Sequence, residues 1–105
     1  MTESLRGVYE LQGMFHQDWD LDYESWDEVI EDFARSRSAY ASAAVTELAN
    51  MAEQWSEKRI RKEIRVIVTQ KEAAKLPQPR WKNAALTLRE RIIAAQRNYG
   101  HWSTD

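Results

Sequence analysis

The clearest capped helix in this sequence is Ser25-Trp26-Asp27-Glu28-Val29-Ile30-Glu31-Asp32-Phe33-Ala34. Its first four residues form an S-x-x-E capping box, and acidic residues fill the first turn, where the helix dipole favours negative charge. Apolar side chains recur at intervals of three and four residues, which places them on one face of the helix. The acidic side chains lie on or beside the opposite face. The pattern therefore predicts a helix with one buried and one acidic side.

The ten residues before this helix alternate aromatic side chains with carboxylates: Phe15-His16-Gln17-Asp18-Trp19-Asp20-Leu21-Asp22-Tyr23-Glu24. Because Asp favours turns and caps over helix interiors, we expect residues 16–24 to form a loop. Residues 4–15 show apolar positions at helical spacing, with Ser4 as the expected N-cap and Gly13 near the expected end. They predict a short amphipathic helix.

Three more helices are expected after Ser36-Arg37-Ser38, which forms a short connection. The segment 38–54 is rich in Ala, which favours helix and lets another helix approach closely. Residues 57–70 carry a stripe of Ile and Val, and the strand-like composition of 65–69 falls within that helical pattern. After a break at two prolines in 75–80, residues 81–99 form the best apolar stripe and end near Gly100.

Helical periodicity runs through the whole chain, and no segment shows the two-residue period of a strand. The sequence thus predicts an all-α, single-domain, compact bundle of about five helices over residues 1–105. Trp26, Trp55 and Trp81 lie on apolar stripes and are predicted core residues. Trp19 and Trp102 lie outside these stripes, and each could face either the core or a partner.

The composition bounds the class of protein. The chain has 105 residues, 43% of them hydrophobic and 30% charged, so it can bury a core and fold as one domain. The absence of cysteine excludes disulfides, zinc–thiolate sites and a thiol nucleophile. No signal peptide is evident at the N-terminus, and no apolar run approaches the ~20 residues of a membrane span. We expect a soluble, cytoplasmic protein.

The charges are strongly segregated along the chain. Residues 1–32 hold ten acidic residues and one basic residue, whereas residues 33–105 hold seven acidic and fourteen basic residues. The net charge of −2 therefore combines −9 in the first part with +7 in the second. A field of this kind acts on association and partner choice rather than on fold.

Catalytic and metal-binding motifs are poorly matched. A calcium loop beginning at Asp20 would need glycine where Ser25 stands, and Ser25 is better explained as a helix cap. The two histidines, His16 and His101, do not form a metal-binding pair by spacing. The sequence contains neither a G-x-S-x-G nucleophile turn nor a Gly-rich phosphate loop. We therefore expect no enzyme activity, no metal and no cofactor.

A nucleic-acid-binding regulator is the alternative that stays open. Ten basic residues of 58–97 could contact phosphates: Lys58, Arg59, Arg61, Lys62, Arg65, Arg80, Lys82, Arg89, Arg91 and Arg97. The pI of about 5.7 and the absence of a helix-turn-helix turn argue against it. We favour the interpretation that these bases partly pair with Glu57, Glu63 and Glu90 and partly face the acidic half of the molecule itself.

The segment Phe15-His16-Gln17-Asp18-Trp19-Asp20, followed by a Ser/Trp-Asp-Glu helix with Val29, Ile30 and Phe33, resembles the immunity proteins of bacterial contact-dependent growth inhibition systems, the CdiI family. The likeness covers residues 5–35, and further on only the arrangement of helix, proline break and Trp81 helix is similar. The resemblance implies a small, mostly helical cytoplasmic protein. It also implies that the protein binds and neutralises the C-terminal toxin domain, often a nuclease, of a cognate effector.

Charge complementarity suggests how such a toxin is bound, because nucleases need cationic clefts for phosphate. We expect a 1:1 complex in which an acidic surface blocks the toxin's active site. The expected toxin-binding residues are Asp20, Asp22, Glu24, Asp27, Glu28, Glu31 and Asp32. A motif shared by immunity proteins against different toxins is poorly placed to specify one of them. We therefore interpret Phe15, His16, Gln17, Asp18 and Trp19 as scaffold.

Overall fold

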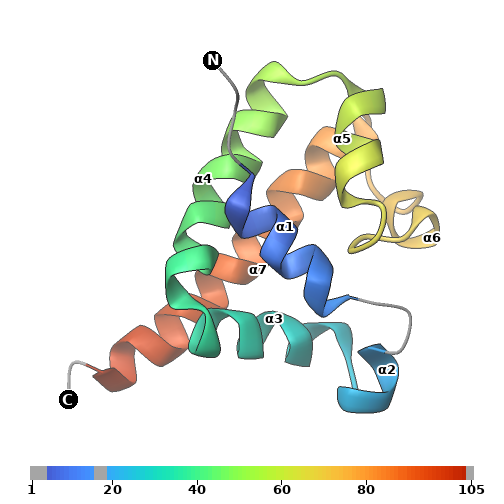
Figure 1. Cartoon of the computed structure of the whole chain (residues 1–105). Coiled ribbons are helices and arrows are strands. Elements are labelled where there is room, and N and C mark those ends of the chain that lie inside the picture. Colours follow the sequence, from blue (N-terminus) through green and yellow to red (C-terminus); the bar gives the residue numbers. More distant parts are fainter. Residues whose placement is uncertain (1–4, 16–18, 104–105) are drawn as a thin grey trace.

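The computed structural model describes residues 5–15 and 19–103, and at Asp20, Asp22 and residues 99–103 it describes the backbone alone. Within those ranges the chain forms seven helices and no strand (Figure 1). The helices are α1 (Arg6–Met14), α2 (Trp19–Asp22), α3 (Trp26–Ser36), α4 (Ser38–Gln54), α5 (Glu57–Ile64), α6 (Gln70–Ala73) and α7 (Arg80–Ser103). Since α2 and α6 are four-residue turns, five longer helices build the fold, and the predicted all-α bundle is confirmed.

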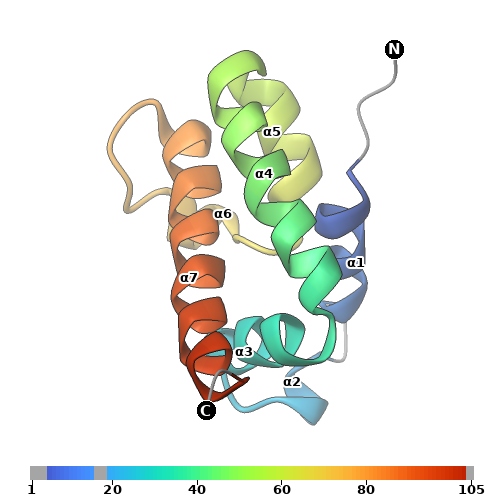
Figure 2. The ribbon, with the colours of Figure 1, turned by 90° about the vertical axis from the view of Figure 1, so that its left-hand side faces the viewer.

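The two longest helices, α4 and α7, pack side by side and form the centre of the bundle (Figures 1 and 2). Helix α1 packs on α4, and α3 crosses one end of the pair and contacts both helices. Helix α5 packs on α7 near the other end. The pair thus holds the acidic α2–α3 segment and the basic α5 at opposite ends of the molecule (Figures 1 and 2).

One continuous apolar core joins the predicted stripes of all five longer helices. Its largest fully buried side chains are Phe33, Leu11, Ile30, Leu48, Met51, Ile60, Ile64, Ile67, Leu88 and Ile92. Trp55 and Trp81 are also buried, as predicted. Trp26 is only partly buried and packs against the edge of the core. The helical periodicity therefore identified the buried faces correctly.

Helices α1 and α4 approach each other most closely at Gly7, which is buried. A Cβ atom built on Gly7 would overlap the backbone nitrogen of Ala44 and the carbonyl oxygen of Tyr40. The alanines of α4 permit a close crossing, as the sequence predicts, but glycine on α1 sets the distance. By contrast, a Cβ on Gly13 would meet nothing within 4 Å.

Two helices take their N-terminal caps from distant glutamates. The Glu47 carboxylate on α4 accepts hydrogen bonds from the Gly7 and Val8 amides of α1, at 3.1 and 2.9 Å. The Glu57 carboxylate on α5 accepts hydrogen bonds from the Trp81 and Lys82 amides of α7, both at 2.7 Å. Each glutamate satisfies amides that the helix itself cannot pair, and so joins two helices.

The sequence predicted a loop over residues 16–24, but residues 19–22 form the helical turn α2. In this turn the Tyr23 amide donates to the Trp19 carbonyl at 3.0 Å. The N-cap of α1 is Leu5, which makes no side-chain cap, and the predicted cap Ser4 lies outside the described residues.

The predicted ends of α5 and α7 are also wrong. Helix α5 ends at Ile64, and the segment 65–69 forms a turn in which the Ile67 and Val68 amides both donate to the Ile64 carbonyl. Its β-branched residues have low helix propensity, and Thr69 caps α6. Helix α7 continues through Gly100 to Ser103, since one glycine costs a helix only about 1 kcal/mol.

Candidate binding surface

The N-terminus of α3 is fixed by the predicted cap. The Ser25 hydroxyl accepts a hydrogen bond from the Glu28 amide at 3.2 Å. The Glu28 carboxylate in turn accepts a hydrogen bond from the Glu24 amide at 3.3 Å, one residue before its usual partner in a capping box. These bonds fix the direction in which the backbone enters α3. They thereby also fix the backbone that bears the acidic side chains on either side of Ser25.

Three carboxylates of this region are exposed, those of Glu24, Asp27 and Glu31, and that of Glu28 is partly buried. Asp27 and Glu31 lie one turn apart on α3, and Glu24 precedes the helix by two residues. We call these four residues the acidic surface. The predicted contact residues Asp20 and Asp22 belong to α2 directly upstream, and their side chains lie outside the described part of the structure.

Asp32 differs from the other acids of α3 because its carboxylate is engaged within the protein. It accepts hydrogen bonds from the Tyr23 hydroxyl at 2.5 Å, the Ser36 hydroxyl at 2.8 Å and the Arg35 guanidinium at 3.0 Å. The hydrogen bonds from Tyr23 and Ser36, with a smaller contribution from Arg35, lower the pKa of Asp32. The Tyr23 bond ties the segment between α2 and α3 to the body of α3, which is a structural role.

Leu21 is an apolar side chain that the sequence reasoning passed over. It lies on α2 between Asp20 and Asp22 and is 80% exposed. Among the large hydrophobic side chains that the structure describes as exposed, it has the highest exposure. The sequence shows a leucine within an acidic segment. Only the helical turn of α2 shows that this leucine is exposed.

The aromatic residues next to the acidic surface form a cluster at the edge of the core. Phe15 is buried, and its ring lies 5.5 Å from the Trp19 ring in an edge-to-face arrangement and 6.3 Å from the Trp26 ring. The Trp26 indole donates a hydrogen bond to the Ile67 carbonyl at 2.9 Å. Of the predicted scaffold motif, Phe15 and Trp19 thus pack inward. His16, Gln17 and Asp18 lie outside the described residues.

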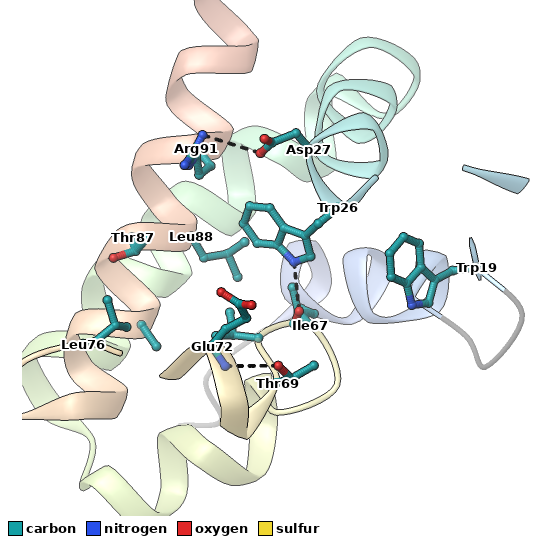
Figure 3. A pocket seen from close by; sticks show the side chains of 12 residues that line it. Trp19, Trp26, Asp27, Ile67, Thr69, Glu72, Leu76, Thr87, Leu88 and Arg91 are labelled. Carbon is teal, nitrogen blue, oxygen red and sulfur yellow. Dashed lines mark hydrogen bonds and ion pairs between the residues drawn. The ribbon is translucent and has the colours of Figure 1, made fainter. Parts of the chain in front are cut away.

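A pocket of about 430 Å³ opens beside this cluster (Figure 3). Its lining comes from α2, α3, the turn after α5, α6, the segment between α6 and α7, and α7. The lining residues are Trp19, Trp26, Asp27, Ile67, Val68, Thr69, Glu72, Leu76, Ala84, Thr87, Leu88 and Arg91. At its mouth the Arg91 guanidinium lies 3.6 Å from the Asp27 carboxylate. Asp27 therefore belongs both to the acidic surface and to the pocket.

Several basic residues of the described part of the chain are engaged within the protein. Arg89 pairs with Glu90 at 3.3 Å, as expected, but the Glu57 carboxylate caps α7 instead of pairing with a base. The sequence predicted from charge alone that Glu57 pairs with a base. In the structure, its carboxylate instead accepts hydrogen bonds from two amides that the helix leaves unpaired. The Arg59 guanidinium lies 3.7 Å from the centre of the Trp55 ring. The remaining bases of α5 and of the turn after it are exposed: Lys58, Arg61, Lys62 and Arg65.

Among residues 5–15 and 19–103, no group of three His, Cys, Asp or Glu side chains is arranged to hold a metal ion. In the same ranges, no helix combines the length and hydropathy needed to cross a membrane.

The comparisons with known proteins identify one family. A family model described as CdiI immunity protein matches residues 9–80, which include α2 to α6, the acidic surface and most of the pocket lining. No curated protein and no solved structure matches the chain.

Proposed function

The chain belongs to the CdiI immunity protein family, and we propose that it neutralises a nuclease toxin by binding it through the acidic surface. Membership of this family implies that the chain binds and neutralises a cognate toxin, and proteins of this kind are generally not enzymes. The class of toxin, the surface that meets it and the stoichiometry are our proposals. These proposals rest on the observation that Glu24, Asp27 and Glu31 are exposed around the capped N-terminus of α3.

The acidic surface suits a cationic partner because its charges are accessible and held in place. The Ser25 and Glu28 bonds fix the backbone that bears these carboxylates, so little conformational freedom is lost when a partner binds. A nuclease presents lysines and arginines to its phosphate substrate. Carboxylates placed against that cleft exclude the substrate and accelerate encounter with the toxin.

An apolar contact is needed beside the charges, since charge pairs give specificity and association rate more than affinity. Leu21 offers such a contact, because it is 80% exposed within the same acidic segment. We place it at the centre of the interface, with Asp20 and Asp22 on either side. Asp32 contributes through the position of α3, since its carboxylate is occupied by Tyr23, Ser36 and Arg35.

The proposed complex contains one immunity protein and one toxin domain. We treat residues 1–105 as a single domain, because one core joins all five longer helices. Inhibition by covering an active site needs one inhibitor for each toxin. The encounter takes place in the cytoplasm, where a nuclease toxin finds its substrate.

Co-purification tests this proposal directly. The test partner is the toxin domain that we expect the neighbouring upstream gene to encode, and it is expressed together with this chain. The mass of the purified complex is measured by light scattering. We expect a 1:1 complex, loss of nuclease activity in it, and survival of cells that express both proteins. A toxin domain that stays free, or cells that die despite expression of this chain, would contradict the proposed function.

A further inference from the structure

The pocket beside the acidic surface has apolar walls and a charged mouth (Figure 3). The indoles of Trp19 and Trp26, together with Ile67 and Leu88, are among its apolar lining residues. Its volume of about 430 Å³ falls in the range of pockets that receive a whole side chain or a small ligand. In Figure 3 the Trp26 indole lies between side chains of α6 and α7, with its N–H directed to the Ile67 carbonyl.

The polar groups of the lining do not favour a small-molecule ligand. Such ligands are oriented by several polar groups that converge inside the site. Here the Thr69 hydroxyl is already occupied by the Glu72 amide at 3.3 Å, and the Trp26 indole N–H by the Ile67 carbonyl. The charged side chains Asp27, Glu72 and Arg91 are all exposed. The interior therefore favours a purely apolar group, while the charges are available to whatever surrounds that group.

The charged residues at the mouth of the pocket favour an occupant in which a basic residue lies next to the apolar group. Two carboxylates, those of Asp27 and Glu72, and one guanidinium, that of Arg91, are among the lining residues. The Asp27–Arg91 pair is 3.6 Å long with side-chain exposures of 58% and 56%, and Glu72 pairs with Lys75 at the same distance. Long, exposed ion pairs of this type contribute little and exchange readily for other partners. Since Asp27 also belongs to the acidic surface, the pocket is continuous with the proposed interface.

We infer that this pocket receives a bulky apolar side chain of the toxin, adjacent in the toxin to a lysine or arginine that pairs with Asp27 and Glu72. This inference rests on the proposed function and adds a second anchor to it, separate from Leu21. The buried side chain supplies affinity, and the flanking base fixes its register.

Filling the pocket from its exposed side tests the inference. Thr87 on α7 is exposed and lines the pocket, so Thr87→Trp would occupy the space without changing the core. The matched control is Thr46→Trp, at an exposed position on α4 that does not line the pocket. Binding of an inactive variant of the toxin domain is measured by titration calorimetry, and the thermal midpoint of each immunity protein is measured alongside.

We expect Thr87→Trp to raise Kd at least tenfold while Thr46→Trp stays within about twofold of the unaltered protein, with similar thermal midpoints for all three. If the unaltered chain binds the toxin and Thr87→Trp binds equally well, the pocket inference is overturned and the proposed function stands. If the unaltered chain does not bind the toxin, both fail together.

A photo-crosslinker identifies the occupant and does not depend on the tryptophan variant. Benzoylphenylalanine is placed at position 75, which is exposed and adjacent to the pocket-lining Leu76 but does not itself line the pocket. The purified complex is irradiated, and the attached peptide is identified by mass spectrometry. We expect a toxin peptide with a bulky apolar residue within two positions of Lys or Arg. Attachment to a second copy of this chain, or to a toxin segment without a base, would overturn the inference.

Discussion

At the scale of single residues, Gly7 allows two helices to come into backbone contact. It lies buried where α1 meets the backbone of Tyr40 and Ala44 on α4. Replacing glycine by alanine inside a helix ordinarily stabilises it by about 0.5–1 kcal/mol. We predict the opposite sign for Gly7→Ala, a loss of about 1–3 kcal/mol, because a Cβ would push the helices apart.

The control for this prediction lies in the same helix. A Cβ on Gly13 meets nothing within 4 Å, so Gly13→Ala should leave the free energy of unfolding unchanged or raise it by up to about 1 kcal/mol. Urea denaturation of the two variants measures both values. Equal effects of the two substitutions would mean that α1 and α4 are not in backbone contact at Gly7.

Asp32 gives a pH-dependent prediction. Its pKa is lowered in the folded state, first by the Tyr23 hydroxyl. A carboxyl group with a lowered folded pKa contributes stability above its unfolded pKa of about 3.9 and loses that contribution as the pH falls through the folded pKa. Tyr23→Phe should therefore cost about 1 kcal/mol at pH 7 and less once Asp32 is protonated.

The measurement is urea denaturation of Tyr23→Phe at pH 7 and at a pH below 3, with Tyr9→Phe as the control. Tyr9 lies on α1 and is 53% exposed, so its hydroxyl should matter little at either pH. A cost for Tyr23→Phe that is the same at both pH values would show that the Asp32 carboxylate is not its main partner.

At the scale of secondary-structure elements, caps explain what the sequence could and could not predict. The Ser25 cap was predictable because its donor, the Glu28 amide, lies three residues away. The Glu57 cap of α7 was not, because its amides lie 24 and 25 residues away and local pattern carries no information about them. Buried stripes were predictable from periodicity, whereas helix ends depended on tertiary contacts.

Glu57 provides the test at this scale. Its carboxylate accepts two hydrogen bonds of 2.7 Å at the start of the longest helix. Glu57→Ala should lower the free energy of unfolding by about 1–2 kcal/mol, the usual cost of losing a cap. Thermal or urea denaturation should show a change below about 0.5 kcal/mol for the control Glu53→Ala, an exposed residue on α4. A similar cost for both variants would contradict the cap.

The proposed binding site was predictable to a different degree. The acidic composition of residues 15–32 pointed to the surface around α3, and the structure exposes Glu24, Asp27 and Glu31 there. The exposure of Leu21 could not be predicted, since it depends on a helical turn in a segment whose sequence predicts a loop. The pocket could not be predicted either, because its walls come from α2, α3, α6 and α7 and from the turn after α5, which only the folded chain brings side by side.

At the scale of the whole molecule, the acidic α2–α3 segment and the basic α5 lie at opposite ends of the α4–α7 pair (Figures 1 and 2). Bases of α7 also reach the acidic end, as the Arg91–Asp27 pair shows. An exposed group of carboxylates attracts and orients a cationic partner before contact. We therefore expect association with the toxin to be fast at low ionic strength and to slow markedly as salt is added.

The central claim is tested most directly by an association rate constant. It is measured for the acidic-surface variant Glu24→Lys/Glu31→Lys and for the control variant Glu53→Lys/Glu90→Lys. Both variants replace two exposed glutamates and change the net charge equally, but only the first alters the acidic surface. Measured by stopped flow with the upstream-encoded toxin domain, the first should associate at least tenfold more slowly than the unaltered chain and with weaker salt dependence, while the control stays within about threefold. Equal slowing by both variants, or no slowing by either, would contradict an interface at the acidic surface.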